Sequence, residues 1–245
     1  KIHKWWHIIK IFIHKIISNH INKFYKLKLK NGKILIDDMD ISKKENYGLV
    51  QEKVGIVFQN PENQIIFNSI YDEMAFSLKG GNNIEEIVDS ALSQVEMLEL
   101  KKQDLYTMSL GQKQRIMIAE VLAKNPKYII LDEPTTMIDS LGKEKIYNII
   151  KTLKKKGFTI ICITNLADEI LLADRTLILS DGKCVEEIEK KDLINKTSIL
   201  RKYGIAEPTI LNILANLKEK GINLSLENFS VEELTEKLKG IIISE

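Results

Sequence analysis

The sequence Tyr-Ile-Ile-Leu-Asp-Glu-Pro at residues 128–134 ends an unbroken apolar run in two carboxylates. An apolar run without alternation is typical of a parallel strand that is buried on both faces. Ligands of open α/β sheets bind at the carboxyl ends of such strands. We therefore expect Asp132 and Glu133 to lie where chemistry is done. An aspartate there can hold Mg²⁺, and the next carboxylate can polarise an attacking water.

A helix is expected before this strand. Ser109 precedes apolar residues at helical spacing, and with Gln112 it has the S-x-x-Q spacing of a capping box. Asn125-Pro126 ends the pattern. The N-terminus of a helix carries roughly half a positive charge and has unpaired N–H groups. The start of this helix is therefore predicted to bind an anion, with phosphate as the obvious candidate.

Together, these two segments resemble the signature loop and the Walker B strand of ATP-binding-cassette (ABC) ATPases. The family signature is Leu-Ser-Gly-Gly-Gln, with which residues 108–112 agree at Ser109, Gly111 and Gln112, and the Walker B pattern is matched throughout residues 129–134. The resemblance implies an α/β fold, with a P-loop NTPase-like (RecA-like) core, a helical subdomain and a C-terminal helical extension. It also implies ATP and Mg²⁺ as cofactors.

Residues 57–64, Val-Phe-Gln-Asn-Pro-Glu-Asn-Gln, resemble the Q-loop of the same family. This string is more specific than a Q-loop glutamine alone. It resembles the corresponding segment in the ATPase subunits of energy-coupling-factor (ECF) transporters, which import vitamins and metal ions. The resemblance implies that Gln59 and Asp132 contact Mg²⁺ and that Glu133 is the general base. A loop amide that only satisfies backbone groups is the alternative for Gln59.

The family works as head-to-tail pairs, in which each nucleotide site takes its signature loop from the partner subunit. The resemblance therefore places Ser109, Gly111 and Gln112 in a partner's site. It also implies that Asp139 is the D-loop aspartate. Asn165 stands at the position of the family's switch histidine, which contacts the γ-phosphate.

We expect an ABC ATPase domain over residues 1–190, with a helical subdomain at about 62–110, and a C-terminal helical extension over residues 191–245. In the family this extension helps the two ATPase subunits to pair. Residues 39–53 are expected to form a charged loop. The other expected elements are helices at 70–105, 141–156, 208–217 and 231–238, strands at 32–38, 54–58 and 159–164, a turn at 80–83 and a hairpin around 181–183.

A P-loop needs two glycines and then Lys and Ser or Thr, because backbone N–H groups, an ammonium and a hydroxyl hold the phosphates and Mg²⁺. None of the Gly-Lys pairs in the sequence is followed by Ser or Thr. Counting back from residues 20–22, which resemble the family's next helix, places the loop at residues 8–15. Isoleucines replace both glycines there. Losing three charge-assisted hydrogen bonds at about 1.5 kcal/mol each weakens binding roughly a thousandfold. We therefore expect very weak ATP binding at the chain's own site.

Residues 1–30 contain all four histidines and both tryptophans. Isoleucines and lysines at helical spacing predict a basic amphipathic helix, which either packs on the sheet or lies on a membrane surface. The histidines are too irregular for a metal site. A shifted reading frame, a decayed gene and a selected degenerate subunit all remain open as origins of this segment.

A net charge of +2 on 245 residues argues against a nucleic-acid surface. Cys162 and Cys184 fit no metal spacing and indicate a reducing compartment. No apolar run approaches the roughly 18 residues that span a bilayer. We expect a peripheral protein on the cytoplasmic face of the cell membrane.

The leading hypothesis is an ATP-binding and ATP-hydrolysing subunit of an ECF importer for vitamins or metal ions, impaired in its own nucleotide site. The resemblance implies three partners: a second ABC ATPase subunit, a transmembrane coupling subunit and a substrate-binding membrane protein. Two alternatives stay open. One alternative is a catalytically inactive subunit that supplies its signature loop to an active homologue. The other is the product of a decayed or frameshifted gene. A soluble cassette protein acting on DNA or ribosomes fits less well, since the surface is not strongly basic and no second cassette follows.

Overall fold

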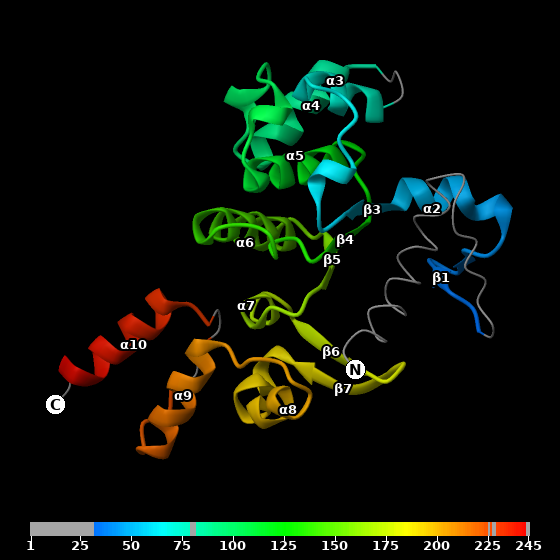
Figure 1. Cartoon of the computed structure of the whole chain (residues 1–245). Coiled ribbons are helices and arrows are strands. Elements are labelled where there is room, and N and C mark those ends of the chain that lie inside the picture. Colours follow the sequence, from blue (N-terminus) through cyan, green and yellow to red (C-terminus); the bar gives the residue numbers. More distant parts are fainter. Residues whose placement is uncertain (1–31, 79–81, 225, 227–228, 244–245) are drawn as a thin grey trace. The chain divides into compact units, whose positions relative to one another are not determined.

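A computed structural model describes residues 32–78, 82–224, 226 and 229–243 of the chain (Figure 1). The chain divides into two compact units, and the described residues up to Ile163 belong to the first and those from Thr164 to the second. The domain boundary expected at residue 190 stays a prediction. The amphipathic helix and the altered phosphate loop expected at residues 1–30 lie outside the described residues.

A three-stranded parallel sheet in the order β3-β4-β5 forms the centre of the first unit. Its strands are β3 (Val54–Val57), β4 (Tyr128–Asp132) and β5 (Thr159–Ile163). The middle strand is the predicted apolar run, and Ile129, Ile130 and Leu131 are all buried. In register, Leu131 lies between Val57 and Cys162. The carboxyl ends of the three strands therefore share one edge of the sheet, as the sequence predicts.

Two long helices, α5 (Leu110–Ala123) and α6 (Ser140–Lys155), contact each other and strands of this sheet. The residues of α6 that are buried are Ile146, Ile149, Ile150 and Leu153. Glycines permit two close approaches. A Cβ at Gly55 of β3 would collide with Val121 of α5, and a Cβ at Gly142 of α6 would lie 2.5 Å from Cγ2 of Ile138.

The segment predicted to be the helical subdomain contains α3 (Ile70–Ser77), α4 (Ile84–Gln94), η4 (Leu98–Leu100) and η5 (Leu105–Thr107). Figure 1 shows α3 and α4 beside α5, and both contact it. Arg115 of α5 donates to the carbonyls of Val95 and Glu96, at 3.0 and 3.3 Å, just after α4 ends. Burial lowers the pKa of Arg115. The turn predicted at 80–83 is present at Asn82-Asn83, and its first two residues lie outside the described part.

The first described segment is a hairpin of β1 (Leu35–Ile36) and β2 (Met39–Asp40), followed by η2 (Lys44–Asn46) and helix α2 (Tyr47–Lys53). The prediction of a charged loop throughout residues 39–53 is therefore wrong. A single buried residue, Val50, packs with Ile41, Val54 and Ile130 and anchors α2. A short helix held by one apolar anchor lacks the repeating pattern that identifies longer helices.

The second unit contains α7 (Ala167–Ile170), the hairpin of β6 (Arg175–Ser180) and β7 (Lys183–Glu189), and η6 (Lys190–Asn195). It continues through α8 (Thr197–Lys202), α9 (Thr209–Glu219) and α10 (Val231–Ile243). The predicted hairpin and both predicted C-terminal helices are confirmed. These elements enclose their own core, which includes Ile178, Ile188, Leu200, Leu211 and Leu214. Among the described residues, no helix has both the length and the apolarity to cross a membrane.

Candidate functional site

Glu133 follows the middle strand at the carboxyl edge of the sheet and is only 4% exposed. Its backbone N–H donates to the carbonyl of Ile163, the last residue of β5, at 2.8 Å. Its φ of 46° lies in the left-handed region, which costs energy for a residue with a side chain. The chain therefore turns at this carboxylate through a strained backbone conformation. Strained residues of this kind cluster at functional sites.

Gln59 reaches this carboxylate from the end of the neighbouring strand. Nε2 of Gln59 donates to Oε2 of Glu133 at 2.6 Å. A hydrogen bond to a charged acceptor is stronger and shorter than one between neutral groups. The alternative for Gln59, an amide that only satisfies backbone groups, does not describe this contact.

Two glutamine side chains fix the backbone of Phe58, the residue before Gln59. The N–H of Phe58 donates to Oε1 of Gln64 at 3.0 Å, and its carbonyl accepts from Nε2 of Gln114 at 3.0 Å. Gln114 is fully buried in α5. The segment that carries Gln59 is therefore held by side chains as well as by strand β3.

Thr136 is a residue of this site that sequence reasoning missed. Its Oγ1 donates to Oε2 of Glu133 at 3.2 Å, so one carboxylate oxygen accepts from both Thr136 and Gln59. The available signal is its spacing, since a hydroxyl three residues after a carboxylate can reach it across one turn. Two donors on one oxygen orient the carboxylate.

Asp132 is the last residue of β4 and is 6% exposed. The structure thus places Asp132, Glu133 and Gln59 at one edge of the sheet, as predicted. Oxygen donors of this kind suit Mg²⁺, which keeps several waters and is usually bound by one or two carboxylates together with phosphate oxygens. The residues present fit that ion, and their role as its ligands stays a prediction.

The first turn of α5 forms the predicted capping box. Oγ of Ser109 accepts from the N–H of Gln112 at 3.3 Å, and Oε1 of Gln112 accepts from the N–H of Ser109 at 2.9 Å. Gly111 is buried, and a Cβ there would lie 3.1 Å from Cγ2 of Ile138. Ser109 is exposed and Gln112 is half-buried. The role of this turn as an anion site stays a prediction.

Lys113 connects this turn to the Q-loop segment. Its Nζ lies 2.6 Å from Oε1 of Glu62, and its side chain is only 6% exposed. The ring of Tyr106 lies 5.9 Å from the same ammonium. A nearly buried ammonium requires such a partner, because an uncompensated buried charge is costly.

Asp139 and Asn165 occupy different surroundings. Asp139 caps α6, and its Oδ1 accepts from the N–H of Gly142 at 2.7 Å. Asn165 is exposed and belongs to the second unit, so it is not placed relative to Glu133. The D-loop role of Asp139 and the switch role of Asn165 stay predictions.

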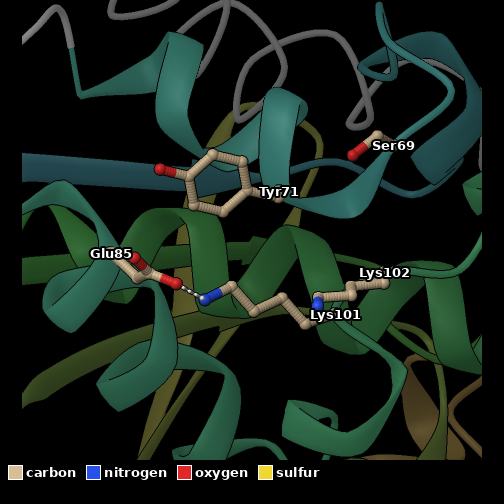
Figure 2. Close-up of a pocket in the computed structure, with 5 residues that line it drawn as sticks. All are labelled: Ser69, Tyr71, Glu85, Lys101 and Lys102. Atoms are coloured by element: carbon tan, nitrogen blue, oxygen red, sulfur yellow. Dashed lines mark hydrogen bonds and ion pairs between the residues drawn. The ribbon is translucent and has the colours of Figure 1, made fainter.

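A cavity of about 440 Å³ lies in the helical subdomain, away from these residues (Figure 2). Its lining includes Tyr71, Glu85 and Lys101. Nζ of Lys101 lies 3.0 Å from Glu85, 2.6 Å from Asp89 and 5.2 Å from the centre of the Tyr71 ring. Two carboxylates therefore neutralise the ammonium of Lys101, one of the two lysines in this lining.

Comparisons with known proteins agree with this geometry. The family model described as ABC transporter matches residues 13–136. The chain is 34% identical over 227 residues to the energy-coupling factor transporter ATP-binding protein EcfA1 of Clostridium perfringens, which covers 91% of this chain and 80% of that protein.

Two solved structures are similar. One is cbiO1 from Clostridium perfringens, described as part of the ABC transporter complex cbiONQ, with a TM-score of 0.67, 29% identity and coverage of 83% of this chain and 82% of that one. The other is the dimeric ATP-binding cassette MJ0796 bound to ADP and Pi, with a TM-score of 0.61, 23% identity and coverage of 74% and 79%. These likenesses confirm the predicted fold class.

Proposed function

Since this chain belongs to the ABC transporter family of ATP-binding proteins, we propose that it is the ATP-binding subunit of an ECF-type importer and pairs with a second ATPase subunit. The observation that carries the proposal is the contact between Gln59 and Glu133, which joins the Q-loop segment to the carboxylate that follows Walker B. The likeness to EcfA1 supports the ECF class. The likeness to cbiO1, part of a transporter complex, supports assembly with membrane partners.

In this proposal, Glu133 accepts the proton of an attacking water, and Gln59 and Thr136 hold its carboxylate in position. A positioned general base contributes about 10² to 10⁴ in rate. Bound Mg²⁺ would neutralise charge on the phosphates, and Asp132 is the residue proposed to hold it. Asn165 takes the place of the switch residue.

The chain's own nucleotide site is proposed to be weak. No glycine-rich phosphate loop with Lys and Ser or Thr occurs in the sequence. The start of α5, in contrast, keeps the signature serine, glycine and glutamine, and the serine and glutamine form a complete capping box. The chain therefore acts chiefly by presenting Ser109, Gly111 and Gln112 to the nucleotide of its partner.

ATP binding tests the two halves of this proposal separately. We expect the isolated chain to bind a fluorescent ATP analogue about a thousandfold more weakly than an ECF-type subunit with an intact phosphate loop. We also expect it to raise phosphate release by that subunit when the two are mixed. Tight binding by the isolated chain would overturn the weak-site assignment, and unchanged phosphate release would overturn the signature role.

Two serine substitutions make a matched pair for the second half. Ser109 and Ser69 both cap a helix by accepting from a backbone N–H at 3.3 Å. Losing either cap costs about 1 kcal/mol of stability. Only Ser109→Ala is expected to lower phosphate release by the mixed subunits, while Ser69→Ala leaves it unchanged. Equal losses in both variants would point to stability rather than to the signature role.

The alternative is a catalytically inactive subunit that contributes only its signature loop. The absent phosphate-loop motif and Asn165 at the switch position favour it. In a mixture with an intact subunit, Glu133→Gln in this chain would then leave phosphate release unchanged. A loss of turnover in that variant supports the leading proposal instead.

A further inference from the structure

Two consecutive residues of α5 hold both ends of the segment that carries Gln59. Nε2 of Gln114 donates to the carbonyl of Phe58 at 3.0 Å, and Nζ of Lys113 lies 2.6 Å from Oε1 of Glu62. Gln59 lies between these two attachment points. Its position against Glu133 therefore depends on where α5 places Lys113 and Gln114.

The two attachments differ in kind. The Lys113 ammonium is nearly buried, so it is strongly held to Glu62, whose own side chain is 52% exposed. Gln114 is fully buried and its Oε1 has no hydrogen-bond partner among the described residues. An unsatisfied buried acceptor carries an energetic cost.

The same helix begins at Ser109, one turn before Lys113. A helix moves as a rigid element over one turn, because its backbone hydrogen bonds join residues four apart. The N–H of Lys113 itself donates to the carbonyl of Ser109 at 2.9 Å. A ligand that displaces the first turn of α5 therefore also displaces the attachment points of the Gln59 segment.

We propose that Lys113 is a positioning residue which, through its ion pair with Glu62, couples ligand binding at the first turn of α5 to the contact between Gln59 and Glu133. Occupation of the signature turn, which serves the partner's nucleotide, then adjusts the general base in this chain's own site. The inference rests on the proposed function for the identity of the ligand. The contacts of Lys113 with Glu62 and of Gln114 with Phe58 do not depend on it.

Hydrogen exchange of the full chain measures the attachment directly. In Lys113→Met we expect backbone amides of residues 57–64 to exchange about fivefold faster than in the wild type, because local opening becomes easier. Lys124→Met is the matched control, since Lys124 caps the far end of the same helix and forms an ion pair with Glu120 at 3.2 Å. Exchange at 57–64 that is unchanged in Lys113→Met would overturn the proposal.

Glu62→Gln provides a second variant that keeps the buried lysine and changes only the more exposed partner. We expect the same fivefold change, and we expect the Lys113→Met, Glu62→Gln double variant to add nothing beyond either single variant. Additive changes would mean that the two residues act independently, which contradicts the coupling.

The coupling itself is measured by adding an ECF-type subunit with an intact phosphate loop, together with ATP and Mg²⁺. Co-elution first establishes that the two chains pair. We expect pairing to change exchange at residues 57–64 in the wild type and not in Lys113→Met. A failure to pair would overturn the proposed function and, with it, the inference. If the chains pair but exchange at residues 57–64 responds equally in the wild type and in Lys113→Met, the inference alone is overturned.

Discussion

Nε2 of Gln59 lies 2.6 Å from Oε2 of Glu133, and the register of the parallel sheet accounts for this contact. Val57 of β3 pairs with Leu131 of β4, so residues 59 and 133 each lie two positions beyond the same register pair. The left-handed φ of Glu133 then turns the chain at this point. A polar contact between residues far apart in sequence thus follows from strand pairing and one strained residue.

Glu133→Gln is expected to lower any ATP hydrolysis that depends on this chain's own site by about 10² to 10⁴. The amide cannot accept a proton as a carboxylate does, while its size is unchanged. Phosphate release by the chain paired with an intact subunit measures the effect. Glu99→Gln, at an exposed position of η4, is the control and should leave the rate unchanged. Full activity in Glu133→Gln would refute the assignment of the general base.

Gly142→Ala is expected to destabilise the first unit by about 1–3 kcal/mol, because the new methyl group would overlap Cγ2 of Ile138. Urea unfolding measures the loss. Gly48→Ala is the matched control, since Gly48 also lies in a helix and nothing lies within 4 Å of its added Cβ. That variant should gain about 0.5–1 kcal/mol through helix propensity. Similar changes at both glycines would contradict the close approach at Ile138.

Asp37 is expected to stabilise the fold in a pH-dependent way. Hydrogen bonds from Lys127, Lys53 and Tyr128 hold the pKa of Asp37 well below its usual range. In the unfolded chain an aspartate has a pKa of about 3.9. The folded state therefore keeps the Asp37 carboxylate ionised at pH values where the unfolded chain takes up a proton. Its contribution is complete above about pH 5 and is lost as the pH falls through the folded pKa.

Asp37→Asn tests this expectation by urea unfolding between about pH 3 and pH 7. The wild type should be more stable than the variant at neutral pH, and the difference should shrink below about pH 4. Salt should also reduce the difference, because the group is near the surface. Asp38→Asn is the control, since asparagine tolerates the left-handed φ at either position. A difference independent of pH would contradict the ion-pair assignment.

Glu120 should have the opposite effect. Burial raises the pKa of Glu120, while Lys124 opposes the shift and the charge of Glu73 adds to it. The folded state therefore binds a proton at pH values where the unfolded chain has released it, so ionised Glu120 costs stability above its folded pKa. Glu120→Gln is expected to be more stable than the wild type near pH 7. Thermal unfolding at a series of pH values measures the difference, which should diminish as the pH falls; a less stable variant at pH 7 would contradict it.

Much of the local structure was predictable because short-range chemistry sets it. The Ser109–Gln112 capping box and the β6–β7 hairpin depend on residues within a few positions of one another. The fold class was implied by the resemblance of two segments to motifs of the ABC ATPases. Helix α2 was missed because Val50 is its single buried residue, so the segment has no repeating apolar pattern.

The sequence by itself determined which residue types stand at the ends of the strands and at the start of α5, because apolar patterning and capping are local. Only the tertiary structure decided that Gln59 and Thr136 meet on one oxygen of Glu133, and that Lys113 holds Glu62. Those contacts depend on strand register, on close helix packing at glycines and on one residue with positive φ. These are properties of segments that meet only when the chain is folded.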